Sequence, residues 1–297
     1  MTKETNKVLL VATALPRAVA VAGRLAVVSL LVLLPTIPAP AKTLRLFVLT
    51  GQSNSLGTPM TTDTNMILPR VLAHPADAQV PFFWDNTADG TPAGDTGLGA
   101  SGGWTNICPQ QGGYYAGSDD HWGPEVGFAR LLWSAGYRDF GIVKASRGGG
   151  GNSFWNQTNV DHHMYDKVVN TVSNAVLALP PGYTHHQIVG LLYVQGESNN
   201  TTEASEADIR FAMLMTNLQI DRANAAGMKA VFGQIASDTA GNRATTTAKQ
   251  YALAAARADI GFAQSTGLSV HNVDGQSVHY NADSLIILGE RMASEAM

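Results

Sequence analysis

The stretch Leu44-Arg45-Leu46-Phe47-Val48-Leu49-Thr50-Gly51-Gln52-Ser53-Asn54 decides the fold. Its apolar first half has the length of a buried strand, which is predicted to end at Thr50-Gly51. A serine in a tight turn after a strand can expose its hydroxyl at the edge of a sheet, where the next helix offers backbone N–H groups to an anion. Most serines in such turns only cap helices, so this turn alone is weak support for a nucleophile.

Similar apolar runs recur at 140–145, 188–194 and 229–235, with a weaker candidate at 260–264 or 268–273. Runs that are apolar on both faces are typical of a parallel sheet covered by helices on both sides. Helical periodicity covers 124–135, 165–179, 203–226, 244–258 and 282–293. The alternation predicts an α/β fold of three layers, α/β/α, with a central parallel sheet. The loops after its strands then meet along one edge.

Composition excludes several classes of protein. The chain has 297 residues, of which 45% are hydrophobic and 14% charged, a balance that supports a sizeable core. Its net charge of −4 provides no basic surface for a phosphate backbone, so no nucleic-acid partner is expected. The single cysteine, Cys108, excludes an internal disulfide and a cysteine-rich metal site.

Residues 1–41 differ from the rest of the chain. Four basic residues precede an apolar run at 25–34, and Ala39-Pro40-Ala41 is similar to a small-residue cleavage site. The run is shorter than the ~20 residues that cross a bilayer. We expect an export signal cut after about Ala41, and hence a secreted or periplasmic protein. An uncleaved N-terminal anchor, with membrane contact, is the alternative. Residues 42–297 then form a single domain.

A long loop insertion is expected in this domain at about 81–123. The segment is rich in glycine, aspartate, threonine and aromatic residues, and it lacks a clear period. Its aromatic residues either form a wall that stacks on sugars or pin the loop as a small cluster. They are Trp84, Trp104, Tyr114, Tyr115 and Trp122.

Three polar, glycine-marked segments each follow a predicted strand. The first contains Ser53, and the second is 144–151, with four consecutive glycines. Such glycines suit a backbone that approaches a ligand or donates N–H groups to an oxyanion, or else a flexible loop. The third, Gln195-Gly196-Glu197-Ser198-Asn199, closes the most apolar strand and needs polar partners.

A histidine that could serve as a base lies near the end of the chain. Val278-His279-Tyr280 precedes the last predicted helix. The adjacent pairs His162-His163 and His185-His186 cannot readily share one helical face or one metal, so surface or supporting roles are expected for them. No metal site is predicted.

Taken together, these motifs resemble the sialate O-acetylesterase and acetylxylan esterase branch of the SGNH hydrolases. Each motif is modest alone, but five in the family order, over about 44–293, are specific. They are Gly51-Gln52-Ser53-Asn54, Trp122-Gly123-Pro124-Glu125, Gly148-Gly149 with Trp155, Gln195-Gly196-Glu197-Ser198, and His279-Tyr280 ahead of Leu288-Gly289-Glu290-Arg291.

The resemblance implies a flavodoxin-like sheet, no cofactor, and hydrolysis of acetyl esters on carbohydrates. Ser53 matches the nucleophile and His279 the base. The backbone N–H groups of Ser53 and of Gly148 or Gly149 match the oxyanion donors, and Gln195 could add a side-chain donor.

Three further residues, Gln52, Asn54 and Glu197, are placed with the oxyanion and substrate-binding groups by the same resemblance. For Glu197 the expected part is to organise its own segment. Arg147, beside the glycines, either meets a substrate carboxylate or makes an ordinary surface ion pair.

One position departs from the family. The aspartate usually found three residues before the histidine is Gln276 here. A glutamine can accept a hydrogen bond from the imidazole but lacks the full charge that stabilises imidazolium, a loss that can cost ~10⁴ in turnover. Asp274 is the favoured substitute, and a Ser–His dyad or a weakly active enzyme is the alternative.

The expected mechanism is acyl transfer through an acetyl-enzyme, with an acetylated carbohydrate as substrate. Two rivals remain open: an esterase of the same fold acting on other acyl groups, and a carbohydrate-binding protein that has lost catalysis. A glycosidase using Glu125 and Glu197 would need carboxylates paired across a cleft, and their motif contexts argue against it.

Overall fold

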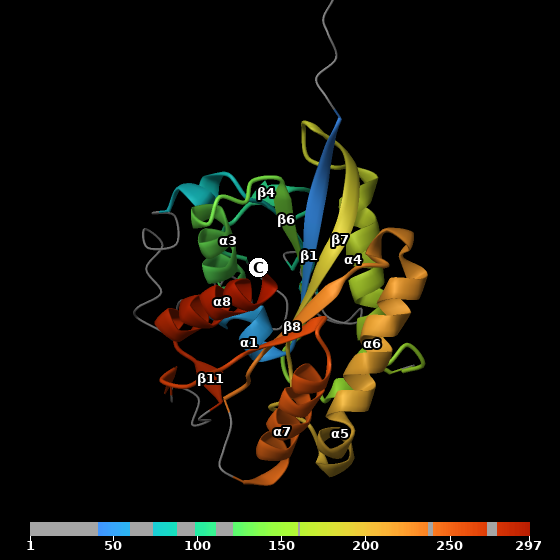
Figure 1. Cartoon of the computed structure of the whole chain (residues 1–297), viewed down its shortest axis with the longest axis vertical. Coiled ribbons are helices and arrows are strands. Elements are labelled where there is room, and N and C mark those ends of the chain that lie inside the picture. Colours follow the sequence, from blue (N-terminus) through green and yellow to red (C-terminus); the bar gives the residue numbers. More distant parts are fainter. Residues whose placement is uncertain are drawn as a thin grey trace, which may run out of the picture. The chain divides into compact units, whose positions relative to one another are not determined.

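Strand β1, Lys42–Gly51, occupies the middle of a seven-stranded sheet (Figure 1). A computed structural model describes residues 41–59, 74–87, 99–110, 121–159, 161–236, 240–271 and 278–297. The chain divides into Met1–Ala39, which lies outside these residues, and Pro40–Met297, to which all that follows refers. The expected export signal or anchor therefore lies outside the described residues, apart from Ala41.

The strand order is β4-β3-β6-β1-β7-β8-β9, with β4 antiparallel to β3 and the other neighbours parallel. The five strands from β6 to β9 follow the flavodoxin-like order 2-1-3-4-5, to which β3 and β4 add an edge. The bounds are β3 Pro81–Trp84, β4 Thr105–Asn106, β6 Phe140–Ser146, β7 Tyr183–Val194, β8 Lys229–Gly233 and β9 Ile260–Ala263. The predicted α/β fold is confirmed.

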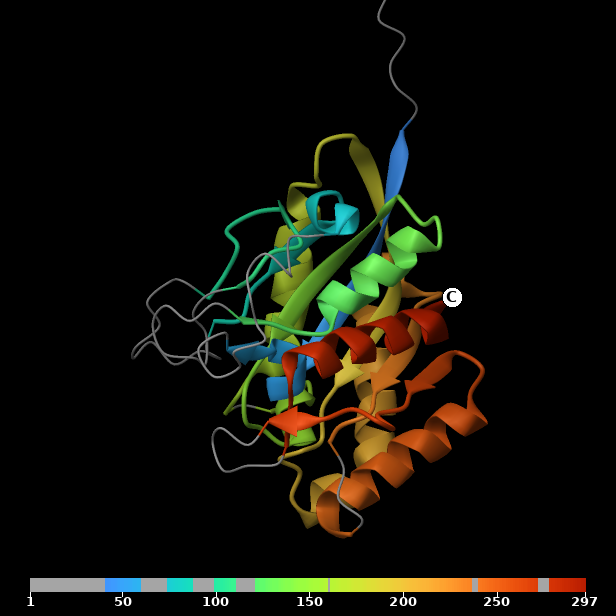
Figure 2. The same cartoon turned by 90° about the vertical axis from the view of Figure 1, so that its left-hand side faces the viewer.

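Helices cover both faces of the sheet (Figures 1 and 2). Helices α3 and α8 pack on one face and α4 and α6 on the other, while α7 packs against β9 and α6. Adjacent residues of β1 show the two sides, because Leu49 joins the α3/α8 cluster and Val48 joins the α4/α6 cluster. The bounds are α3 Glu125–Ser134, α4 Met164–Leu177, α6 Ala207–Asp221, α7 Gly241–Ala256 and α8 Ala282–Ala296.

Helices α3 and α8 cross at two glycines, where their backbones touch. A Cβ added to Gly127 would lie 1.9 Å from Ile286 O, and one added to Gly289 would lie 2.0 Å from Pro124 O. No larger residue fits this crossing. None of the helices in the described ranges combines the length and the apolar character needed to span a bilayer.

Shorter elements complete the domain and carry much of the site. Helix α1 (Ser53–Leu56) follows β1, and α5 (Thr201–Ser205) follows β7. Two small antiparallel sheets pair β2 (Thr58–Pro59) with β5 (His121–Trp122), and β10 (Val270–His271) with β11 (His279–Tyr280). The 3₁₀ helices are η1 Pro75–Ala78, η2 Asn152–Trp155 and η3 Ala223–Ala225.

The expectation of a loop throughout 81–123 is wrong in its described parts. Pro81–Trp84 forms β3 of the central sheet, and β4 and β5 also lie in this segment. Such a strand is hard to recognise, because it is short and its proline is tolerated only as its first residue. Trp84 and Trp122 are buried and cannot stack on a sugar, whereas Tyr114 and Tyr115 lie outside the described residues.

Two smaller expectations also change. The helical pattern at 203–226 is divided among α5, α6 and η3. The strand candidate at 260–264 forms β9, whereas at 268–273 only Val270–His271 pairs, with β11 and outside the central sheet.

Candidate active site

The three polar segments start level with one another because their strands end in register. Gly51 of β1 lies opposite Ser146 of β6 and opposite Val194 of β7. The chain leaves β1 toward β6 on one side and returns to β7 on the other, so this is the topological switch point at which open α/β sheets bind ligands. The prediction that the segments meet at one edge is confirmed.

Ser53 is held in a turn that only glycine permits. Gly51 has φ +139°, and a Cβ on it would lie 2.0 Å from Val194 O. The next residue, Gln52, donates its backbone N–H to the same oxygen at 2.9 Å. The chain then enters α1 with Ser53 as its first residue, which is 7% exposed.

His279 lies within hydrogen-bonding reach of the serine. Its Nε2 is 2.9 Å from Ser53 Oγ. When the ring carries its proton on Nδ1, Nε2 accepts from the hydroxyl, which is the arrangement of a nucleophile and its general base. Asp274 and Gln276, the candidates for orienting this imidazole, both lie outside the described residues.

Asn54 fixes the segment that carries the histidine. Its Nδ2 donates to Val278 O at 2.8 Å, and its Oδ1 accepts from Tyr280 N at 2.9 Å. The two residues on either side of His279 are thus bound to the residue after Ser53. Asn54 is 1% exposed, so its amide positions the base from within the protein. The resemblance had placed this residue with the groups that bind the oxyanion or the substrate.

Gln52 has a similar internal part. Its Oε1 accepts from the backbone N–H groups of Gly196 and Ser198, both at 3.2 Å, and its Nε2 donates to Ser198 Oγ. These bonds tie the turn after β1 to the turn after β7.

Glu197 places a carboxylate beside this group. Its Oε1 accepts a short hydrogen bond from Asn54 Nδ2, whereas Oε2 is buried and has no partner among the described residues. Burial disfavours the charged form and raises the pKa of Glu197 to about 7, although the bond from Asn54 opposes that shift.

Side chains of neighbouring segments pack against the loop of four glycines at 148–151. A Cβ on Gly150 would meet the Phe154 ring at 2.5 Å, and one on Gly151 would meet the Glu203 carboxylate at 2.0 Å. Gln195 Nε2 donates to Gly150 O and to Asn199 Oδ1, at 3.1 and 2.9 Å. Its amide therefore stabilises the loop in this structure, and the expected role of Gln195 as an oxyanion donor stays a prediction.

The backbone N–H groups expected to bind the oxyanion, unlike the Gln195 amide, are not used within the described part of the protein. Within the described residues, the backbone N–H groups of Ser53, Gly148 and Gly149 donate to no protein acceptor. Gly149 is exposed and has φ +57°. Arg147 borders them: its backbone N–H bonds Gly51 O, and its guanidinium donates to Gly149 O and lies 4.7 Å from the centre of the Phe154 ring.

A buried ion pair supports the nucleophile helix. Lys144 of β6 donates to Glu125 Oε2 at 2.9 Å, to Gln110 Oε1 at 2.7 Å and to Leu56 O, at the end of α1, at 2.8 Å. Burial lowers the pKa of Lys144, and Glu125 counteracts that shift. Glu125 is 0% exposed, so the glycosidase alternative that used it as a catalytic acid is wrong.

The sequence did not predict the structural roles of Lys144 and Gln110. It also did not predict that Asn199 and Glu203 support the glycine loop. For Lys144 a signal existed, because a lysine inside an otherwise apolar strand needs a buried partner. In the described ranges, no three histidine, cysteine, aspartate or glutamate side chains are grouped so as to hold a metal ion.

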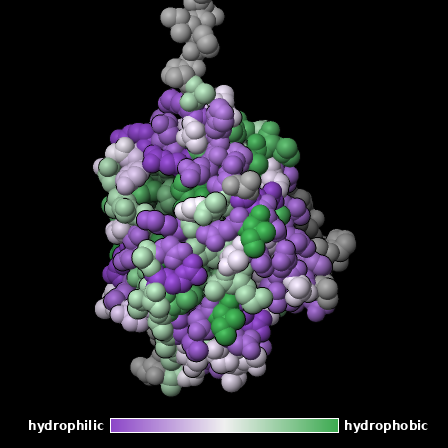
Figure 3. All heavy atoms as spheres, turned by 45° about the vertical axis from the view of Figure 1, so that its right-hand side comes forward, coloured by the Kyte–Doolittle hydropathy of each residue, from purple (hydrophilic) through white to green (hydrophobic). Residues whose placement is uncertain are grey.

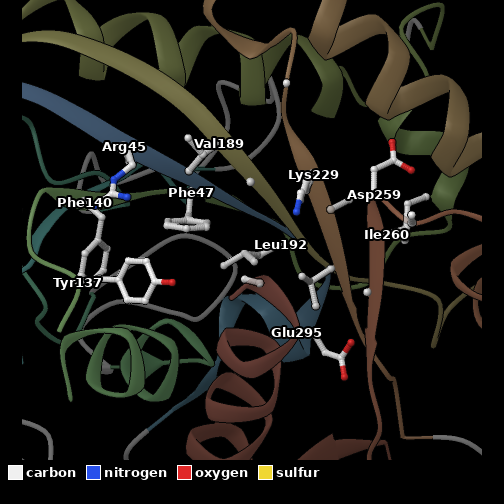
Figure 4. Close-up of a pocket in the computed structure, with 17 residues that line it drawn as sticks. Arg45, Phe47, Tyr137, Phe140, Val189, Leu192, Lys229, Asp259, Ile260 and Glu295 are labelled. Carbon is white, nitrogen blue, oxygen red and sulfur yellow. The ribbon is translucent and has the colours of Figure 1, made fainter. Parts of the chain in front are cut away.

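A cavity of about 390 Å³ lies away from these residues (Figure 4). It is lined by the first residues of β6, β8 and β9 and by Val189, Gly190 and Leu192 of β7. Phe47 lies across its floor, and Arg45, Lys229, Asp259 and Glu295 also line it.

Comparison with known proteins places this site in a family. The model of the carbohydrate esterases described as sialic acid-specific acetylesterases matches residues 43–297. The chain belongs to this family. The resemblance inferred from the motifs is confirmed, and membership makes the chain a carbohydrate O-acetylesterase by class. No curated protein matches the sequence significantly.

Solved structures of low identity share the fold. A protein of Arabidopsis thaliana is 20% identical, with a TM-score of 0.63 over 86% of this chain and 98% of that one. A carbohydrate acetylesterase of Xanthomonas citri is 18% identical, with a TM-score of 0.58 over 85% of this chain and 55% of that one. NanS is 16% identical, with a TM-score of 0.53 over 86% of this chain and 97% of that one.

Proposed function

We propose that the chain is a serine esterase that removes O-acetyl groups from carbohydrates through an acetyl-enzyme. The observation that carries the proposal is the 2.9 Å contact between His279 Nε2 and Ser53 Oγ at the switch point of the sheet. A nucleophile and base within hydrogen-bonding reach are what acyl transfer requires. Membership of a carbohydrate esterase family supplies the substrate class.

The first half of the reaction forms the acetyl-enzyme. His279 removes the proton from Ser53 Oγ as the oxygen attacks the ester carbonyl. The resulting oxyanion accepts from the backbone N–H groups of Ser53, Gly148 and Gly149, and the loss of one such donor typically costs ~10²–10³ in turnover. When the intermediate collapses, the C–O bond to the sugar breaks and His279 returns the proton to the leaving sugar oxygen.

The second half repeats these steps with water. His279 takes a proton from a water molecule, whose oxygen attacks the acetyl carbonyl. The bond to Ser53 Oγ then breaks, the serine regains a proton from His279, and acetate leaves. Asp274 is the hydrogen-bond partner that we propose for the imidazole. An Asp274→Asn variant that kept full turnover would instead favour a Ser–His dyad.

The start of the chain has the sequence pattern of an export signal. We propose that 1–41 directs export, because the basic start, the apolar run and Ala39-Pro40-Ala41 have the order of a signal sequence. Sequencing the amino terminus of the mature protein tests this: a start near Lys42 is expected, and an intact Met1 would support the anchor instead.

Acetate release is the decisive measurement. We expect release from acetylated xylan, O-acetylated sialic acid or p-nitrophenyl acetate, and its loss in Ser53→Ala. Since Ser53 is nearly buried in a short turn, the control is Ser205→Ala, an exposed serine in α5, which should leave turnover unchanged.

The rivals predict different results in the same assay. A folded wild type that releases no acetate from any substrate, yet binds glycan equally well with and without the Ser53 hydroxyl, would support a carbohydrate-binding protein. Faster turnover of long-chain acyl esters than of sugar acetates would support an esterase for other acyl groups.

A further inference from the structure

A second groove opens on the same edge of the sheet as the catalytic pair. It has a volume of about 330 Å³ and lies between α7 and the ends of β8 and β9. We call it the Tyr251 groove, and its lining residues are Gln234, Ala244, Thr247, Ala248, Tyr251, Phe262 and Gln264.

One face of α7 forms a wall of the groove. The four α7 residues have the spacing i, i+3, i+4 and i+7, which brings them to the same side of a helix. Two of them, Ala244 and Ala248, have small side chains that leave the space open. Tyr251, the last of the four, has a large one.

Tyr251 provides an aromatic surface. Tyr251 is 54% exposed, and it is the one aromatic residue among the exposed large hydrophobic residues in the described part of the chain. Figure 3, which brings the right-hand side of Figure 1 forward, shows separate apolar side chains among hydrophilic ones on that face. The Tyr251 ring meets Phe262 edge-to-face, with centroids 5.4 Å apart and planes at 86°, so its orientation is fixed.

The polar residues of the groove are neutral. Gln234 and Gln264 carry amides, which donate and accept hydrogen bonds, whereas the Thr247 hydroxyl oxygen is buried. Among the described residues, none that lines the groove is charged. An aromatic face beside amides suits an uncharged pyranose, which has an apolar C–H face and a rim of hydroxyls, better than a phosphate or a carboxylate.

The groove is joined to the catalytic base. Gln234 O accepts from Tyr280 OH at 3.0 Å, and Tyr280 follows His279 directly. Gln234 Oε1 is itself fixed by the backbone N–H of Ser265 at 2.9 Å. One hydrogen bond therefore joins the backbone of Gln234, in the wall of the groove, to the residue that follows the base.

We propose that the Tyr251 groove is an accessory subsite that binds neutral sugar residues of the glycan whose acetyl group is cleaved at Ser53. This inference rests on the proposed function and extends it, because it assigns the enzyme to polymeric or oligomeric acetylated glycans with an uncharged backbone. Tyr251 stacks on the pyranose, and Gln264 bonds its hydroxyls.

Binding is tested with xylohexaose, which is neutral and carries no acetyl group, against the Ser53→Ala protein by calorimetry. Adding Tyr251→Ala should weaken binding about tenfold, as the loss of one aromatic contact of ~1.4 kcal/mol predicts. Tyr251→Phe keeps the ring and should retain most of the affinity. Leu177→Ala, which truncates an 82% exposed side chain on α4, is the matched control and should change nothing.

Kinetics in the otherwise wild-type protein give the second readout. Tyr251→Ala should raise KM for acetylated xylan about tenfold, the same factor as the loss of affinity, and leave kcat/KM for p-nitrophenyl acetate unchanged. Equal losses on both substrates would overturn the subsite, because they would indicate damage to the packing on Phe262.

Three other results would also overturn it. They are an affinity of Tyr251→Ala equal to that of Leu177→Ala, binding of charged oligogalacturonate as tight as that of xylohexaose, and a dimer that dissociates when Tyr251 is replaced. A wild type that hydrolyses no ester but loses xylohexaose binding on Tyr251→Ala would sink the proposed function and leave the subsite standing.

Discussion

At the scale of single residues, Asn54 connects the groups on which catalysis depends. It follows the nucleophile in the chain, binds both neighbours of the base, and donates to Glu197. A single buried amide therefore sets the position of His279 relative to Ser53. Its donor group is shared between a carbonyl and a carboxylate, so the charge of Glu197 acts on the same contact.

The carboxyl of Glu197 should make stability depend on pH. Its folded pKa is about 7, raised from 4.5, so between these values the unfolded state ionises while the folded state stays protonated. The stability that this carboxyl contributes is therefore fully present below about pH 4.5 and is lost as pH rises toward 7. Between pH 5 and pH 8, wild type should lose about 2 to 3 kcal/mol relative to Glu197→Gln.

Urea unfolding of both proteins at several pH values measures this difference. The glutamine keeps an oxygen that can accept from Asn54, and any fixed cost of its buried amide cancels in the comparison between pH values. Glu295→Gln, at an exposed glutamate of α8, is the control and should run parallel to wild type. Parallel curves for Glu197→Gln and wild type would contradict the prediction.

At the scale of elements, the end of β1 is the most constrained turn of the site. Gly51→Ala adds a methyl group 2.0 Å from Val194 O and also imposes a strained φ. Gly136→Ala is the matched control, because Gly136 has φ +94° but nothing within 4 Å of its added Cβ. We expect Gly136→Ala to cost about 1 kcal/mol, the strain alone. Gly51→Ala should cost at least ~3 kcal/mol and abolish turnover.

Thermal unfolding and acetate release, measured on both variants, distinguish the effect of the strained φ from that of the clash with Val194 O. Similar losses of stability in the two proteins would contradict the prediction, because they would mean that β7 yields to the added methyl group. The result bears directly on Ser53, since the collision displaces the turn that presents it.

Elements with a continuous apolar run could be predicted from sequence, and the shorter ones could not. Strands β1, β6, β7 and β8 were expected because residues buried on both faces leave a clear run. Strand β3 was missed because its four residues begin with a proline and gain their place only by pairing with β6. Pairing of that kind depends on the fold as a whole and leaves little local signal.

The same division holds within the candidate site. Ser53 and His279 were expected from motifs, and their contact is confirmed. The inward roles of Asn54 and Gln195 were not, because an amide that binds substrate and one that binds backbone look alike in sequence. Their partners, Val278 O and Gly150 O, are backbone atoms that any residue type provides.

At the scale of the whole molecule, the candidate active site and the cavity beside Phe47 lie in different parts of the sheet. The polar segments and the Tyr251 groove lie at the carboxyl ends of the strands, whereas the cavity of about 390 Å³ is lined by Phe47, by residues 189, 190 and 192 of β7 and by the first residues of β6, β8 and β9. Phe47 forms the floor of that cavity, and four residues, roughly 13 Å at ~3.3 Å per residue, separate it from the end of β1. The cavity is thus a feature of packing at a distance from the chemistry.

Phe47→Ala should therefore change stability without changing catalysis. The ring lies against Gly190, whose added Cβ would come within 2.4 Å of it, and packs edge-to-face on Phe128 at 4.9 Å. Because Phe47 is only partly buried, its truncation should cost about 2 kcal/mol, less than the 3–5 kcal/mol of a fully buried phenylalanine. Thermal unfolding should show that loss, while KM and kcat for p-nitrophenyl acetate, measured well below the unfolding temperature, stay at wild-type values. A change in KM at unaltered stability would instead show that the cavity and the active site are coupled, and that the cavity takes part in function.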